Sequence, residues 1–184
     1  MKFTIIAFIT FGLLLAFVQC RSRVAVAKYE IKQGSLLNGG RSYDIKSKTT
    51  NIRFSTENEL LRIGKKLTLL ENGKPRYIVT HKLLNLWSTW SITDAITGRE
   101  VGQIKNKFKV IGAKIHAEGD FGKYVIKGEF GKHTYKISKN HHKVAQIHKD
   151  RFHLHDTYGL KVYGNEDQAL MILFAIVVDE IRQH

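Results

Sequence analysis

The chain has 184 residues, with 30 lysines and arginines against 16 aspartates and glutamates, and a formal net charge of +14 with histidine neutral. This length suits one typical domain. The positive balance favours an anionic partner, such as lipid headgroups, nucleic acid or acidic polysaccharide. An ordinary basic surface without a specific partner is the alternative that charge alone leaves open. Because the chain has one cysteine, Cys20, a framework of internal disulfides is excluded and the fold must be held by its own core.

Residues 1–20 have the pattern of a secretory signal peptide. Lys2 precedes an apolar stretch over residues 3–18, and a cleavage pattern ends at Cys20. We expect cleavage after Cys20, which leaves a secreted protein without a transmembrane span. The alternative is an uncleaved segment that anchors the protein in a membrane, because the apolar stretch is long for a signal peptide. In both cases we expect a single folded domain over residues 21–184.

Alternation of apolar and polar residues is the main signal between about Tyr29 and Tyr163, and it predicts half-buried antiparallel strands. In residues 104–110, lysines occupy one face and Ile104 lies on the other. Turn signals recur between these stretches. They are Asn38-Gly39-Gly40, Asn72-Gly73, Thr97-Gly98, Glu118-Gly119-Asp120, Phe130-Gly131-Lys132 and Ser138-Lys139-Asn140. Many short strands with regular turns predict a closed barrel.

The last stretch, residues 165–184, predicts the helix around which the barrel closes. Asn165 and Gln168 have the spacing of a helix capping box. Residues 169–178 are apolar without interruption, so this helix is apolar on every side and must be enclosed. Burying these side chains would contribute about 15–30 kcal/mol before ordering entropy is subtracted. The run is too short to cross a bilayer, which needs about 20 apolar residues.

An ordered set of segments resembles the LURP-one-related family. The segments are Lys28-Tyr-Glu-Ile-Lys-Gln33, His81-Lys82-Leu83 before a Trp/Ser strand, Tyr124-Val-Ile-Lys-Gly128-Glu-Phe130, Val144-Ala-Gln-Ile-His-Lys149, Asp156-Thr157-Tyr158-Gly159-Leu160 and the helix that ends at Asp179. The resemblance runs from about Lys28 to Arg182. It groups the chain with tubby C-terminal domains and phospholipid scramblases, and it implies a barrel of about twelve strands around a central hydrophobic helix. For function, it implies association with lipids and no established catalytic activity.

The remaining motifs favour neither catalysis nor a metal centre. No nucleophile elbow, metalloprotease motif, P-loop or dinucleotide fingerprint occurs, so we expect a protein that is not an enzyme. His148, His153 and His155 have a spacing that a zinc site could use, but surface histidines explain the same pattern. Residues 156–167 contain three acidic side chains, and a calcium site needs about six to eight oxygen ligands. We therefore expect no cofactor and no metal.

The leading candidate site is a set of alternating lysines on one predicted strand, Lys105, Lys107 and Lys109. Arg99 would flank this set and Lys114 would extend it. Further lysines would join if their strands adjoin, namely Lys123, Lys127, Lys132 and Lys136. Each cation near an anionic bilayer contributes about 1 kcal/mol, which is enough for peripheral contact with a membrane. A solvated outer face of the barrel is the alternative.

The sequence thus predicts a secreted, non-enzymatic binding protein for an anionic ligand, with acidic or phosphorylated lipid headgroups as the leading class. The alternative is an extracellular polyanion-binding or defence-related protein, whose ligand would be a glycosaminoglycan, a microbial envelope or nucleic acid.

Overall fold

The computed structural model describes residues 25–37, 40–60, 64–84, 87–107, 114–129, 134–150 and 157–182. These residues form twelve strands and one helix, α2 (Gln168–Arg182). The strands are β1 (Ala25–Leu37), β2 (Gly40–Ser47), β3 (Arg53–Leu60), β4 (Lys65–Glu71), β5 (Lys74–Leu84), β6 (Trp87–Asp94), β7 (Glu100–Lys107), β8 (Ile115–Gly119), β9 (Gly122–Glu129), β10 (Thr134–Lys139), β11 (His142–Asp150) and β12 (Thr157–Tyr163).

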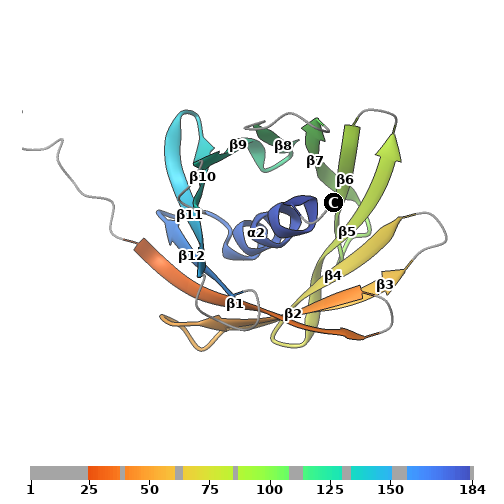
Figure 1. The fold of residues 1–184 in the computed structure, drawn as a ribbon, viewed down its shortest axis with the longest axis horizontal. Coiled ribbons are helices and arrows are strands. Elements are labelled where there is room, and N and C mark those ends of the chain that lie inside the picture. Colours follow the sequence, from red (N-terminus) through yellow and green to blue (C-terminus); the bar gives the residue numbers. More distant parts are fainter. Residues whose placement is uncertain are drawn as a thin grey trace, which may run out of the picture.

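The strands form one closed barrel in which every pairing is antiparallel. Each strand pairs with its neighbours in the chain, and β1 pairs with β12 to close the ring. Figure 1 shows the strands arranged around α2, which lies inside the ring. The structure therefore confirms the predicted fold class, a closed antiparallel barrel wrapped around a C-terminal helix.

The helix is enclosed because it has no polar face to present to water. Its residues 169–180 are all buried, and Met171, Ile172 and Phe174 have no exposed surface. The inward-facing strand residues pack on them, as the period-two alternation predicts, with Ile104 and Ile126 as examples from β7 and β9. No helix within the described ranges has the length and apolar character needed to span a membrane.

The start of the helix differs from the capping box predicted at Asn165. The helix begins at Gln168, and Asp167 is the cap, since its Oδ1 accepts the backbone N–H of Leu170 at 3.1 Å. Gly164 precedes it with a φ of 69°, so the chain turns there before the cap is reached. The prediction of Asn165 was wrong because two acceptors compete in this segment, and the turn at Gly164 places the later one against the helix.

Tyrosines and cations hold the acidic residues that precede the helix. The Tyr77 hydroxyl donates to Asp167 Oδ2 at 2.7 Å, and the Tyr124 hydroxyl donates to Glu166 Oε2 at 2.6 Å. Lys139 Nζ lies 3.4 Å from the same Glu166 oxygen. Burial, together with these hydrogen bonds to carboxylates, raises the pKa of both tyrosines above the ordinary value.

Two buried carboxylates, Asp179 and Glu180, lie at the other end of the helix. The C-terminus of a helix disfavours negative charge, so these groups need compensating partners. The Tyr43 hydroxyl lies 2.9 Å from Asp179 Oδ2 and 2.9 Å from Glu180 Oε1. Tyr158 also donates to Asp179, and Lys65 Nζ forms an ion pair of 2.8 Å with Glu180. Side chains from three strands therefore fix this end of the helix in the barrel.

Candidate anion-binding surface

Outward-facing lysines on four of five adjacent strands form a row across the barrel wall. Lys28 on β1 is directly opposite Lys161 on β12. Gln146 on β11 follows Lys161 in register, and Lys136 on β10 is opposite Gln146. Lys127 on β9 is directly opposite Lys136. We call these four lysines, Lys28, Lys161, Lys136 and Lys127, the lysine row. At about 4.8 Å between strands, the row is about 19 Å long.

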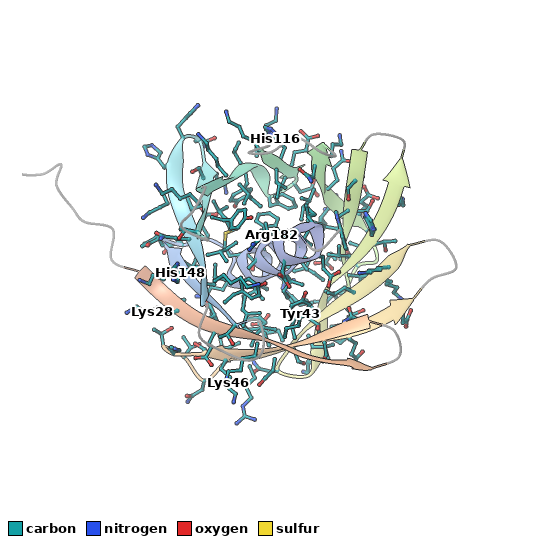
Figure 2. All side chains as sticks on the ribbon, viewed as in Figure 1. Lys28, Tyr43, Lys46, His116, His148 and Arg182 are labelled. Carbon is teal, nitrogen blue, oxygen red and sulfur yellow. The ribbon has the colours of Figure 1, made fainter. Side chains whose placement is uncertain are left out.

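Alternation along each strand explains why these side chains face outward. Tyr29, Leu160, Ile137 and Ile126 are neighbours of the row lysines in the chain, and all of them are buried in the core. The lysines at the adjacent positions therefore point to the opposite side of the sheet, and all four are exposed. Figure 2 shows Lys28 and His148 projecting away from the barrel on the same side of the molecule.

The row contains like charges placed directly opposite one another. The pairs Lys28 with Lys161 and Lys136 with Lys127 each bring two cations face to face across neighbouring strands. Such pairs destabilise a sheet by a few tenths of a kcal/mol or more, about the size of the gain from opposite charges. A bound anion would remove this repulsion.

Three of the four row lysines lie apart from the carboxylates of the described residues. Among the described residues, no acidic side chain forms an ion pair with Lys28, Lys127 or Lys161. Glu30 is close in sequence to Lys28 and lies on the same face of β1. It contacts Lys32 at 3.2 Å and Lys48 at 2.9 Å, and these hydrogen bonds lower its pKa. The positive potential of Lys28, Lys127 and Lys161 therefore remains available to a ligand.

Residues beside the row are polar and add donors. Gln146 lies within it and accepts Lys143 Nζ at 3.3 Å. His148 is exposed one outward position further along β11, and its Nδ1 lies 3.2 Å from the Thr134 hydroxyl. The surface can therefore offer ammonium, amide and imidazole groups to an anion.

The lysines predicted on β7 have a different environment. Lys105 Nζ lies 3.3 Å from Glu118 on β8, and Arg99 forms an ion pair of 2.6 Å with Asp120. Lys107 ends β7 opposite Trp87, and Lys114 is exposed just before β8. Lys109 lies outside the described residues. The structure thus places Lys105 and Arg99 beside carboxylates, which reduces their positive potential.

A cavity next to Lys105 is lined by acids. It has a volume of about 410 Å³, and its lining contains Glu100, Glu118 and Asp120 together with one cation, Lys123. Carboxylates around a cavity repel anionic ligands, so the outer surface of β7 and β8 suits an anion less well than the lysine row.

Half of the lysine row was predicted from the sequence. Lys127 and Lys136 were expected to join a larger patch if their strands adjoined, and β9 does pair with β10. Lys28 and Lys161 were missed. Their alternation with buried neighbours is visible in the sequence, but the pairing that brings them together joins the first strand to the last.

The histidine site also depends on residues that the structure does not describe. His148 is exposed on β11, whereas His153 and His155 lie outside the described residues. Within the described part of the chain, no group of three metal-ligating side chains comes together.

The fold and the surface together define a class of protein, a closed antiparallel barrel that encloses a hydrophobic C-terminal helix and carries cations in register on its outer face. The chain belongs to the LURP-one-related family, whose sequence profile matches residues 27–179. The match begins in β1 and ends in the last turns of α2, and it confirms the resemblance found in the sequence. No curated protein matches the chain significantly.

Proposed function

We propose that the chain is a secreted, non-enzymatic binding protein that docks on anionic surfaces, with acidic lipid headgroups as its ligands. The lysine row is the observation that carries this proposal. Its four cations are aligned on one face of the barrel. Lys28 and Lys161, which are far apart in the sequence, become neighbours where β1 pairs with β12 and closes the barrel.

The magnitude of the attraction suits reversible docking. Four lysines near an anionic bilayer contribute about 1 kcal/mol each, which together corresponds to about a thousandfold in partitioning. The row is exposed, so at physiological salt its attraction for an anion is largely screened beyond a Debye length of about 8 Å. Contact at shorter distances keeps part of the attraction.

Secretion is part of the proposal and rests on the signal-peptide pattern of residues 1–20, which lie outside the described residues. N-terminal sequencing of the protein recovered from the medium of expressing cells tests it, and we expect the mature chain to begin at Arg21. A chain that stays with the cell membrane and retains residues 1–20 would show the anchored alternative.

Co-sedimentation of the whole chain with vesicles tests ligand class. Neutral phosphatidylcholine vesicles give the baseline, which includes any contribution of the apolar residues 3–18. We expect vesicles with phosphatidylserine to bind more protein than this baseline. The amount bound should fall as salt rises, but it should still exceed the baseline at physiological salt. Equal binding to neutral and acidic vesicles would contradict the proposal. Binding to heparin in preference to acidic vesicles would favour the polyanion alternative.

A further inference from the structure

We propose that a polar cavity at the β2–β3 turn is a binding site for a phosphate monoester. The cavity has a volume of about 510 Å³, within the range of about 300–1,000 Å³ typical of small-molecule sites. Its lining comes from the end of β2, the turn and the start of β3. The lining residues are Asp44, Ile45, Lys46, Ser47, Thr50, Asn51, Ile52 and Arg53. We call this cavity the β2–β3 pocket. The inference deepens the proposed function, because it gives the basic surface a ligand class, but the pocket can be tested without a membrane.

Two cations in the lining of the pocket are direct neighbours across paired strands. Lys46 on β2 is directly opposite Arg53 on β3, and both side chains are exposed on the outer face of the barrel. Figure 2 shows Lys46 projecting away from the strands. Like charges directly opposite one another are unfavourable in a sheet, and a dianion between them would convert this repulsion into attraction.

Arg53 is the stronger of the two candidate ligands for the anion. Its guanidinium forms no ion pair with any acidic side chain of the described residues. A guanidinium presents a planar fork of donors that matches two oxygens of a phosphate group. Lys46 lies 3.8 Å from Asp44, but both side chains are largely exposed, and exposed pairs of this kind contribute only about 0–1 kcal/mol. Lys46 can therefore turn to an anion at little cost.

The backbone around the pocket is fixed before any ligand arrives. Ser47 Oγ accepts the backbone N–H groups of Thr49 at 3.2 Å and Thr50 at 2.9 Å, which holds the turn closed. On the other side, Asn72 Oδ1 accepts the N–H of Arg53 at 3.0 Å, and the Asn72 N–H donates to the Arg53 carbonyl at 2.8 Å. Preorganisation of this kind lowers the ordering cost of binding.

The donor set suits a phosphate monoester better than a monoanion. Lys46, Arg53 and the carboxylate of Asp44 leave the pocket with a net positive charge, and a phosphate monoester carries a charge of about −1.5 to −2 near pH 7. The exposed Asn51 side chain, also in the lining, supplies a neutral amide donor. A carboxylate, a phosphodiester or a sulfate ester carries one negative charge and gains less from the positive potential of the pocket, because the attraction scales with the charge of the ligand.

Phosphate monoesters reach a protein either as free small molecules or as lipid headgroups. The position of the pocket allows both sources, because the β2–β3 turn adjoins the lysine row: the Lys48 N–H donates to the Lys28 carbonyl at 2.7 Å, and Lys28 N–H donates to Thr49 Oγ1 at 3.2 Å. A protein docked through the lysine row would therefore bring the pocket close to the same surface.

The first arm of the test uses a soluble probe and no membrane. Titration calorimetry of the whole chain with glycerol 3-phosphate should give saturable binding with one site, and glycerol sulfate should bind at least tenfold more weakly. Arg53→Gln and Lys46→Gln should each weaken glycerol 3-phosphate binding at least tenfold. Arg53→Lys keeps the charge but loses the fork of donors, and we expect an intermediate loss. Lys82→Gln removes one exposed cation from β5 and is the matched control.

The second arm distinguishes the sources. Vesicles with phosphatidic acid carry a monoester headgroup, and vesicles with phosphatidylglycerol at equal surface charge carry a diester. If the wild type prefers phosphatidic acid to phosphatidylglycerol and Arg53→Gln removes this preference, the source is the lipid. If the wild type binds glycerol 3-phosphate but shows no preference between the two lipids, the source is a free phosphate ester. Either outcome supports the pocket. Absence of saturable glycerol 3-phosphate binding, or binding that Arg53→Gln leaves unchanged, would overturn the proposed pocket.

A further variant separates the pocket from the docking surface. The triple variant Lys127→Gln/Lys136→Gln/Lys161→Gln should keep glycerol 3-phosphate binding while losing vesicle binding. Failure of the pocket proposal can therefore be distinguished from failure of the docking proposal.

Discussion

At the scale of single residues, Tyr43 connects the barrel wall to the buried acids of the helix. Replacement by phenylalanine removes the hydroxyl that lies 2.9 Å from both Asp179 and Glu180 and keeps the ring. We expect Tyr43→Phe to lower the free energy of unfolding by about 1–3 kcal/mol, the usual cost of leaving a buried acceptor unsatisfied. Urea denaturation at pH 7 measures this change. Tyr163→Phe is the control, because no hydrogen bond of the Tyr163 hydroxyl occurs among the described residues, and it should change stability by less than about 0.5 kcal/mol.

The same variant gives a prediction for pH. Burial, and secondarily the nearby Asp179 and Glu180, raises the pKa of Tyr43 far above its ordinary value of 10.0. In the unfolded chain this tyrosine ionises near pH 10, so the stability that its protonated form contributes is present below pH 10 and is lost as pH rises above it. The loss is about 1.4 kcal/mol per pH unit. The difference in stability between the wild type and Tyr43→Phe should therefore narrow between pH 9 and pH 11. A constant difference would show that Tyr43 ionises normally in the folded protein.

At the scale of elements, α2 is the part of the fold that sequence predicts best. Ten consecutive apolar residues, 169–178, leave no polar face, and no arrangement other than enclosure keeps them from water. The hairpin turn at Asn72-Gly73 was equally readable, since both residues have positive φ, 50° and 77°, which asparagine and glycine tolerate. The cap at Asp167 was not predicted, because Asn165 and Asp167 are both good capping residues and the geometry of the preceding turn decides between them.

Enclosure of α2 makes a quantitative prediction. Ile172 is fully buried in the helix, whereas Ile96 is 77% exposed in the turn between β6 and β7. The substitutions Ile172→Ala and Ile96→Ala remove the same atoms. We expect Ile172→Ala to lower the free energy of unfolding by about 2–5 kcal/mol, because a cavity remains in the core. Ile96→Ala should change it by less than about 0.5 kcal/mol. Similar effects of the two substitutions, measured by urea denaturation, would contradict the enclosure of the helix.

At the scale of the whole molecule, the distribution of charge matters more than its total. The formal charge of +14 indicates an anionic partner but does not locate the contact. Lys105 was chosen from the sequence because alternation is clear there, and Arg99 because it flanks that strand, yet the structure places Glu118 and Asp120 against them. Lys28 and Lys161 are at opposite ends of the chain, and only the closure of the barrel makes them neighbours. Register between distant strands is set by packing of the whole core, so local patterns do not reveal it.

The most direct test of this account compares two variants of equal charge on acidic vesicles. The triple variant Lys127→Gln/Lys136→Gln/Lys161→Gln removes three cations of the lysine row, and Lys66→Gln/Lys74→Gln/Lys82→Gln removes three from β4 and β5, across the barrel in strand order. Melting curves confirm that both fold. At about 1 kcal/mol for each lysine, the row variant should lose about a hundredfold in partitioning onto phosphatidylserine vesicles at physiological salt. The control should retain binding within about threefold of the wild type. Equal losses in the two variants would show that net charge alone governs binding and would contradict a docking surface at the lysine row.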